Sequence, residues 1–282
     1  MQTCQRVSDL RAQLTQARSA GKRIALVATM GNLHEGHLQL IRLAKTLADV
    51  VVASIFVNPL QFGLNEDWEQ YPRTLERDSA MLSAEGCDLL FCPTETDMYP
   101  NGMETQTKVE VPTMTNILCG ASRPGHFLGV TTVVAKLLNM VQPDTAIFGI
   151  KDYQQLTVIK RMVEDLCIPV QIVAAPIARA DDGLALSSRN SYLTAEERPR
   201  AVALYQTLCR ARDTVQAGIR DYATIEASAQ QQLAQAGMRP DYFSIRQAKT
   251  LEPATATDTD LVLLGAVYLG KTRLIDNVTL TI

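Results

Sequence analysis

The sequence predicts a doubly wound α/β fold with a parallel sheet, followed by a smaller α+β domain. Five short apolar runs have the length and composition of buried strands: residues 24–28, 50–57, 89–92, 146–149 and 170–174. Helical patterns at 36–48, 72–85, 130–141 and 153–165 alternate with them. Strands rich in Val, Ile and Leu that are separated by helices are typical of a parallel sheet covered on both faces.

The pattern changes after residues 180–183, ADDG. Two polar helices, at 195–216 and 222–236, precede strand-like runs at 242–246, 261–268 and 272–279. Helices followed by consecutive strands indicate an α+β arrangement. We therefore predict a first domain over residues 1–178 and a smaller second domain over residues 179–282. The change of pattern between them is gradual and falls near residues 175–185.

Composition narrows the class of protein. The chain has 282 residues, 46% of them hydrophobic, and a net charge of -3, which indicates no broad basic surface for nucleic acid. No run predicts a signal peptide or a membrane span. The six cysteines have no CxxC spacing, so we expect mostly buried, reduced thiols in a cytoplasmic protein rather than a zinc site or disulfides.

The most informative segment is TMGNLHEGH at residues 29–37, between the first strand and its helix. Backbone N–H groups at a helix start form an anion site, and Gly31 and Gly36 allow close approach of a phosphate. His34 and His37 can share one face if the helix has begun. Metal binding or a purely structural turn are alternatives, but the helical zinc motif needs histidines four apart, so phosphate contact is favoured.

Four further segments follow strands or precede helices. SIFVNPLQFG at 54–63 offers the amide of Gln61 at the end of a strand, and SRPGHFLGV spans 122–130. FGIKDYQQL at 148–156 places Lys151 at a helix start, where a bound anion would offset the unfavourable helix dipole, and Gln155 one turn later. LSSRN at 186–190 offers hydroxyls and the fork of Arg189, although an ordinary helix-capping loop is also possible.

One motif match is rejected. GAVYLGKT at residues 265–272 fits the P-loop pattern letter for letter. A P-loop, however, opens onto a helix inside a parallel sheet, whereas both flanks here alternate like strands. We predict a hairpin turn at this point.

Taken together and in this order, the five segments resemble the pantoate–β-alanine ligase family over essentially the whole chain. This family belongs to the nucleotidylyltransferase superfamily with the HxGH motif, so the resemblance implies a Rossmann-like first domain. It implies that the carboxylate of pantoate attacks the α-phosphorus of ATP, which expels pyrophosphate and gives a pantoyl adenylate. The amine of β-alanine then displaces AMP, and pantothenate forms without a covalent enzyme intermediate.

The resemblance also implies site residues. His34, His37, Lys151 and Arg189 would be catalytic, with His37 the candidate proton donor, and Gln61 and Gln155 would hold pantoate, with Gln61 also near β-alanine. The ATP-binding set would be Met30, Gly31, Asn32, Leu33, His34, Glu35, Gly36, His37, Gly149, Ile150, Lys151, Asp152, Ala178, Leu186, Ser187, Ser188 and Arg189. The apolar wall against the gem-dimethyl group of pantoate would be Met30, Phe56, Val133, Val134 and Leu137.

The family further implies ATP with Mg²⁺ as co-substrate, no tightly bound organic cofactor, no protein ligands that we can name for the metal, and a homodimer. Two positions depart from the family pattern. Ala28 stands where proline is usual, and Ile150 stands where a polar or acidic residue is common. The loss of the proline frees a backbone angle, which is expected to weaken binding of pantoate.

Two other functions fit parts of the pattern. A nucleotidylyltransferase that leaves the adenylyl group on its product would share the HxGH turn but would not explain Gln61 together with Gln155. A catalytically inactive nucleotide-binding regulator would keep the fold, yet the groups proposed for the chemistry are all present. The ligase is therefore favoured over both.

Overall fold

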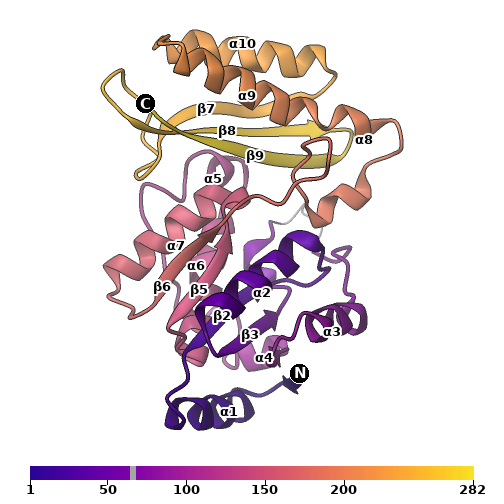
Figure 1. The fold of residues 1–282 in the computed structure, drawn as a ribbon, viewed down its shortest axis with the longest axis vertical. Helices are drawn as coiled ribbons and strands as arrows, with labels where there is room; N and C mark the ends of the chain where they lie inside the picture. The colour runs from indigo at the N-terminus through magenta and orange to yellow at the C-terminus, as the bar shows by residue number, and fades with distance from the viewer. Residues whose placement is uncertain (64–67) are drawn as a thin grey trace. The chain divides into compact units, whose positions relative to one another are not determined.

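The computed structural model describes residues 1–63 and 68–282. The chain forms two compact units (Figure 1). The first unit comprises residues 1–150 and 158–176, and the second comprises residues 151–157 and 177–282. The predicted boundary between residues 178 and 179 stays a prediction. Within the described parts of the chain, no helix combines the length and the apolar character needed to cross a membrane.

The first unit is built on a six-stranded sheet in which every neighbouring pair of strands is parallel. The strand order is β1-β4-β3-β2-β5-β6. The strands are β1 (Gln2–Cys4), β2 (Ile24–Thr29), β3 (Val50–Ile55), β4 (Leu89–Phe91), β5 (Thr145–Gly149) and β6 (Gln171–Ala175). Five of these six strands were predicted, and their parallel pairing confirms the expected sheet.

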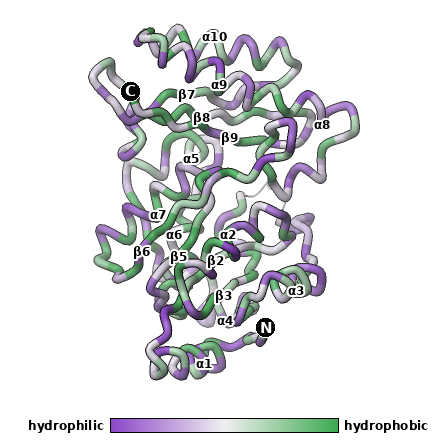
Figure 2. The backbone as a smooth tube through the Cα atoms, in the orientation of Figure 1, coloured by the Kyte–Doolittle hydropathy of each residue, from purple (hydrophilic) through white to green (hydrophobic). Residues whose placement is uncertain are grey.

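Helices cover both faces of this sheet. Ala25 and Val27 of β2 share a core with Ile41, whereas Ile24 and Leu26, which point to the opposite face, are buried equally well. Figure 2 shows the hydrophobic character of β3. The helices are α1 (Val7–Ser19), α2 (Glu35–Leu47), η1 (Pro59–Gln61), α3 (Leu75–Ala84), α4 (Glu95–Met98), α5 (Cys119–Ser122), α6 (His126–Val141), η2 (Ile150–Asp152) and α7 (Tyr153–Asp165), the last of which contributes residues to both units. The doubly wound fold class is confirmed.

The strand order identifies where a ligand is expected. From β2 the chain proceeds outward through β3 to β4, and it then returns to place β5 on the other side of β2. The order therefore reverses between β2 and β5. In open α/β sheets ligands bind outside the carboxyl ends of the strands at such a reversal. The segments that begin at Met30 and Ile150 leave the sheet at this point.

Two elements at the amino terminus were not predicted. Strand β1 has three residues and pairs only with β4 at the edge of the sheet, so its apolar pattern is too short to recognise. Helix α1 buries only Leu10 and Leu14, and its other residues are exposed or half-exposed. Its weak amphipathic pattern gave no helix signal in the sequence.

The single helix predicted over residues 195–216 is wrong, because the structure has two. They are α8 (Glu197–Arg200) and α9 (Ala203–Gln216). Pro199 lies inside α8, and proline supplies no N–H for a continuing helical ladder. The predicted helix over 130–141 begins four residues earlier, at His126, after Gly125 in the left-handed region with φ 81°.

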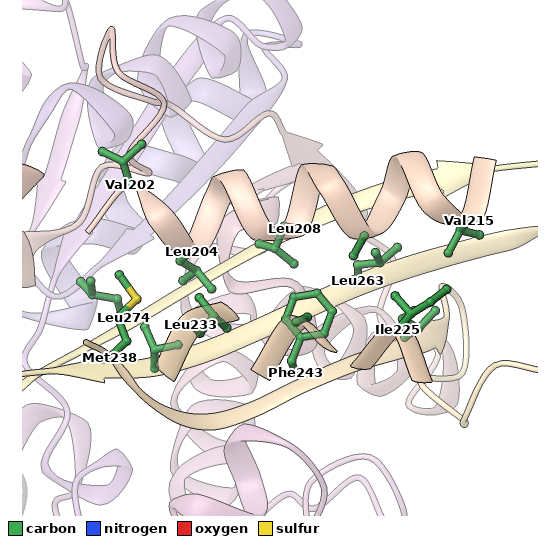
Figure 3. Close-up of a cluster of buried hydrophobic side chains, with 14 of the residues drawn as sticks. Val202, Leu204, Leu208, Val215, Ile225, Leu233, Met238, Phe243, Leu263 and Leu274 are labelled. Atoms are coloured by element: carbon green, nitrogen blue, oxygen red, sulfur yellow. The ribbon is translucent and has the colours of Figure 1, made fainter. Parts of the chain in front are cut away.

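The second unit has a three-stranded antiparallel sheet in the order β7-β8-β9. Its strands are β7 (Arg239–Gln247), β8 (Asp260–Leu269) and β9 (Thr272–Thr281), and its helices include α9, α10 (Tyr222–Gln235) and the short η3 (Ser188–Tyr192). Side chains of α9 and α10 pack against the sheet, with Leu208 and Phe243 at the centre of the cluster (Figure 3). The α+β prediction is confirmed.

The P-loop match lies in a β-hairpin, as predicted. Gly265 is inside β8, and Leu269 pairs with Thr272 across a turn formed by Gly270 and Lys271. Gly270 has φ 56°, a conformation in which glycine is favoured. The backbone N–H groups of Val267 and its neighbours therefore belong to an antiparallel sheet, not to an anion-binding loop.

All six cysteines are free thiols: Cys4, Cys87 and Cys119 are buried, Cys92 and Cys209 are half-buried, and Cys167 is exposed. Burial raises the pKa of Cys87 to about 11 and that of Cys92 to about 11. A thiol reacts as its thiolate, so these two side chains remain protonated and poorly nucleophilic near neutral pH.

Candidate functional site

The 29–37 turn connects β2 to α2, and its two histidines cap the helix. His34 is the N-cap residue of α2, with Nδ1 accepting a hydrogen bond from the backbone N–H of Gly36 at 3.1 Å. The Nδ1 atom of His37 accepts from the backbone N–H of His34 at 3.3 Å. His34 thus lies just outside the helix, and the two rings are 4.1 Å apart between centroids.

This capping arrangement has a chemical consequence. A neutral imidazole with Nδ1 as acceptor carries its proton on Nε2. Both His34 and His37 are therefore set up as Nε2–H donors. Donors at the positive end of the helix dipole suit a phosphate, and this explains why these two residue types occur at this turn.

Asp78 of α3 binds the backbone of the same turn. Its carboxylate is fully buried and accepts hydrogen bonds from the backbone N–H of Asn32 at 2.7 Å and of Leu33 at 2.9 Å. Thr74 donates a further hydrogen bond at 3.0 Å. Gly31 has φ 82°, and a Cβ there would lie 3.1 Å from both Asp78 and Ile55. The turn is therefore fixed by a buried carboxylate, a residue that the sequence analysis did not single out.

The predicted pantoate residues of the first unit lie together. Gln61 of η1 is 7% exposed, and its amide donates to the sulfur of Met30 at 2.9 Å. Asn58 donates to the Oε1 of Gln61 at 3.2 Å and to the carbonyl of Gly129 at 3.1 Å. These contacts connect the 54–63 segment to both the 29–37 turn and α6.

Further residues fix the amide cluster, which is the pair of side chains of Asn58 and Gln61. Tyr99 donates its hydroxyl proton to Oδ1 of Asn58 at 2.7 Å, and burial raises the pKa of Tyr99, so that the proton stays in place. Nδ1 of His126 is 2.8 Å from the carbonyl oxygen of Gln61. The rings of Phe56 and Tyr99 are 6.2 Å apart. Sequence reasoning did not assign roles to Asn58, Tyr99 or His126, although NPLQ and the third histidine of the chain were visible signals.

The remaining apolar residues proposed for pantoate are Phe56 and three residues of one helix. Val133, Val134 and Leu137 of α6 are all buried, at 4–6% exposure. Phe56, at the end of β3, is 8% exposed. The structure thus supplies an apolar helix next to the amide cluster of Asn58 and Gln61.

Gly129 sets the distance between α6 and η1. A Cβ at this position would overlap the carbonyl of Leu60 and lie 2.5 Å from the backbone nitrogen of Gln61. Gly129→Ala is therefore expected to push the two segments apart, with a cost of about 1–3 kcal/mol in the free energy of unfolding, as for overpacked cores. The resemblance to the ligase family then predicts that the KM for pantoate rises more than the KM for ATP, which steady-state kinetics can measure. Gly102→Ala, which adds a Cβ in open space but strains a backbone with φ 83°, is the control for a loss of stability without displacement of α6, and it should leave both KM values unchanged.

Lys151, with residues 152–157 that follow it, belongs to the second unit. Lys151 lies in the 3-10 turn η2 with Ile150 and Asp152, just after Gly149 ends β5. Its backbone carbonyl accepts a hydrogen bond from Asn277 at 2.9 Å, and its ammonium group is 3.5 Å from the carboxylate of Asp152. Gln155 is half-buried in the first turn of α7. Because Lys151 precedes that α-helix, the predicted one-turn spacing to Gln155 crosses a 3-10 segment.

The 186–190 loop is anchored at both ends. The backbone N–H of Leu186 donates to the carbonyl of Ala178 at 2.9 Å, and Asn190 donates to the carbonyl of Ala185 at 3.0 Å. The Oγ of Ser187 caps η3 by accepting from the backbone N–H of Arg189 at 3.3 Å. The helix-capping alternative thus describes the local structure, and an anchored turn with Ser188 and Arg189 also suits phosphate contact.

Hydrogen bonds connect several of the segments proposed for the site within each unit, but the roles of their residues stay predictions. In the first unit the 29–37 turn, Gln61 and the α6 residues form one connected set. In the second, Lys151 and the loop that starts at Ala178 both contact β9. Over residues 1–63 and 68–282 no group of three or more His, Cys, Asp or Glu side chains is placed to hold a metal ion. Ala28, the departure from the family pattern, is paired within β2 like its neighbours.

Comparison with known proteins extends these observations over the whole chain. The family model for pantoate-beta-alanine ligase matches residues 2–279. Pantothenate synthetase of Saccharophagus degradans is 58% identical over 282 residues, which is 100% of this chain and 99% of that protein.

Two solved structures support the same relationship. The crystal structure of pantothenate synthetase from Thermus thermophilus has 45% identity and a TM-score of 0.92, covering 99% of each chain. Pantoate-beta-alanine ligase from Francisella tularensis, solved in complex with beta-gamma ATP and β-alanine, has 35% identity and a TM-score of 0.81, covering 99% of this chain and 97% of that one. The chain therefore belongs to the pantoate–β-alanine ligase family.

Proposed function

We propose that this chain catalyses the ATP-dependent condensation of pantoate with β-alanine to give pantothenate, AMP and pyrophosphate. The family match over residues 2–279 carries this conclusion. A carboxylate oxygen of pantoate attacks the α-phosphorus, the bond to the β-phosphate oxygen breaks, and pyrophosphate leaves. The amine of β-alanine then attacks the acyl carbon, AMP leaves with the bridging oxygen, and the nitrogen loses its proton. The protein has to align anions and stabilise the leaving group, so no nucleophilic side chain is needed.

We assign the phosphates of ATP to two histidines, a lysine, two serines and an arginine. His34 and His37 would donate from Nε2, and the capping bonds that hold their Nδ1 atoms support this role. Lys151, Ser187, Ser188 and Arg189 would neutralise and bind the departing pyrophosphate. His37 is the proposed proton donor. The backbone of residues 30–36, 149–152, 178 and 186 would hold the rest of the nucleotide.

We assign pantoate to the amide cluster of Asn58 and Gln61, to Gln155 and to the apolar residues predicted to contact its gem-dimethyl group. Gln61 and Gln155 would bind its hydroxyls and carboxylate, and Gln61 would also lie near the incoming amine. Met30, Phe56, Val133, Val134 and Leu137 would contact the gem-dimethyl group. The burial of Gln61 beside Met30 supports this assignment, because a buried amide is ordered before the substrate binds.

The remaining parts of the proposal concern the metal, assembly and location. Mg²⁺ would arrive with ATP as part of the co-substrate and would neutralise phosphate charge. Family resemblance supports a homodimer, which light scattering after size-exclusion chromatography tests. A cytoplasmic location is consistent with the six free thiols.

The reaction is tested by following oxygen atoms. The purified chain is incubated with Mg²⁺, ATP, β-alanine and pantoate labelled with ¹⁸O in its carboxylate. We expect pantothenate and pyrophosphate, with one ¹⁸O atom in the phosphate of AMP, because the bridging oxygen leaves with AMP. ADP as the nucleotide product, or AMP without label, would contradict the acyl-adenylate reaction.

Omission of β-alanine separates the alternatives. The ligase is expected to exchange labelled pyrophosphate into ATP only when pantoate is present. An inactive nucleotide-binding regulator would bind ATP without exchange, and a nucleotidylyltransferase would release a stable adenylylated product. A control variant, Lys271→Ala, replaces a lysine in the β8–β9 hairpin that is not among the residues proposed for the site. It should exchange pyrophosphate like the parent chain.

A further inference from the structure

Strand β9 carries two adjacent polar residues that are almost completely buried. Asp276 is 4% exposed and Asn277 is 1% exposed, although they lie in an edge strand of the three-stranded sheet. Buried polar groups have to be hydrogen-bonded, and a buried carboxylate has to be paired. The partners of this dipeptide are therefore informative.

Asn277 contacts the segment that carries Lys151. Its Nδ2 donates to the backbone carbonyl of Lys151 at 2.9 Å, across 126 residues of sequence. This carbonyl lies in the short η2 turn, where the regular ladder of α7 has not begun. The contact fixes the backbone from which the lysine side chain extends.

Asp276 contacts the segment that leads into the 186–190 loop. Its two carboxylate oxygens accept from the guanidinium of Arg179 at 2.6 and 2.9 Å. Arg179 also donates to the carbonyl of Gly183 at 3.0 Å and lies over the ring of Tyr205 at 3.7 Å. Burial raises the pKa of Asp276, and the bonds and charge of Arg179 oppose this shift. The pair thus anchors the segment around Arg179, which forms an isolated β-bridge with Ala185, to β9.

The two contacts share one backbone. Successive residues of a strand point to opposite faces, so Asp276 and Asn277 can reach two different segments from adjacent positions. Leu274 and Leu280, which share the parity of Asp276, belong to the core under α9 and α10. Asn277 projects from the other face, where it meets η2.

We propose that Asp276 and Asn277 are positioning residues that hold Lys151 and the 186–190 loop in register for the same ATP phosphates. The inference deepens the proposed function and rests on it, because it assumes that Lys151 and Arg189 bind those phosphates. A displacement of about 1 Å at a charged contact to the leaving group is enough to reduce turnover strongly. Neither residue touches the substrate in this role.

A double-mutant cycle tests the Asn277 contact. Asn277→Ala is expected to lower kcat/KM for ATP, measured by pantoate-dependent pyrophosphate exchange, by about tenfold, the scale of one lost hydrogen bond. The KM for pantoate should change by less than twofold. In a Lys151→Ala background the same substitution should change kcat/KM for ATP by less than about twofold, because the group that it positions is gone. Asn277→Asp, which keeps the shape but lacks the donor, should behave like Asn277→Ala.

The Asp276 contact has a parallel cycle. Asp276→Asn is expected to lower kcat/KM for ATP by a similar factor, and the loss should shrink in an Arg189→Ala background. The control is Asp241→Asn, which weakens the ion pair of Asp241 with Arg273, also on β9, at 2.7 Å. Asp241→Asn should keep kcat/KM for ATP within twofold of the parent, even if its thermal unfolding midpoint falls as far as that of Asp276→Asn.

The outcomes separate the two levels of the proposal. Parental kcat/KM for ATP in Asn277→Ala and Asn277→Asp would overturn the positioning role, as would losses of kcat/KM that add fully to that of Lys151→Ala. Neither result would contradict the proposed contacts of Lys151 and Arg189 with the phosphates. An equal loss in Asp241→Asn would show a merely structural effect and would also overturn it. If Lys151→Ala itself retained full turnover, the proposed function of Lys151 would fail, and the positioning of that residue would fail with it.

Discussion

Replacement of His37 by alanine is expected to lower kcat by about 10²–10³, the scale of one lost transition-state donor. The physical reason is the N-terminal cap of α2: Nδ1 of His37 accepts from the backbone N–H of His34, and this leaves Nε2–H to donate. Negative charge grows on the phosphates as pyrophosphate departs, so a fixed donor acts most strongly in the transition state. Single-turnover formation of the acyl adenylate measures the effect on the chemical step.

His37→Gln provides the matched control for this prediction. Its amide can donate a hydrogen bond but cannot transfer a proton at neutral pH. A partial recovery relative to His37→Ala would assign His37 to electrostatic stabilisation, whereas no recovery would support proton transfer. A turnover of His37→Ala within about twofold of the parent would exclude the residue from the chemistry.

Asp78→Ala is expected to have the second large effect, on both stability and turnover. The substitution removes the acceptor for the backbone N–H groups of Asn32 and Leu33 in a fully buried place. Each unsatisfied buried donor costs about 1–3 kcal/mol, so the free energy of unfolding should fall by roughly 2–5 kcal/mol. Because the turn holds His34 and His37, kcat should fall by about tenfold or more. Chemical denaturation and steady-state kinetics measure the two effects.

The control compares a similar carboxylate on the surface. Asp97 of α4 also accepts from a backbone N–H, that of Thr94 at 2.9 Å, but the contact is exposed. Asp97→Ala should therefore lower the free energy of unfolding much less than Asp78→Ala, as an exposed lost helix cap, with turnover unchanged. Asp78→Asn, which keeps one acceptor oxygen, should lie between the parent and Asp78→Ala. Equal effects of Asp78→Ala and Asp97→Ala would contradict the proposed support of the turn.

Local patterns were sufficient where the chemistry of one segment decides its structure. The apolar runs of β2, β3 and β5 identify a parallel sheet because each strand is buried on both faces. The alternation on both sides of Gly270 identifies a hairpin despite the P-loop match. The 29–37 turn is recognisable because glycine and paired histidines occur together at a strand-to-helix junction.

Local patterns failed where burial or pairing depends on distant residues. Strand β1 is a strand only because β4 supplies a partner 87 positions away in register, Gln2 with Leu89. Asp78 gives no sequence signal, because a carboxylate in an amphipathic helix is ordinarily exposed. Its role follows from two backbone N–H groups more than 40 residues earlier in the chain.

Periodicity, turn residues and ordered motifs are local properties, so the fold class, the family and the segments proposed for the chemistry could be predicted from the sequence. The groups that hold those segments in place became visible only in the folded chain. The buried Asp78, the Asn58–Tyr99 pair and the Asp276–Asn277 dipeptide act through contacts between residues far apart in the chain. Distant partners meet only in the folded chain, where burial requires each polar group to be paired, and a linear pattern does not encode which groups will meet.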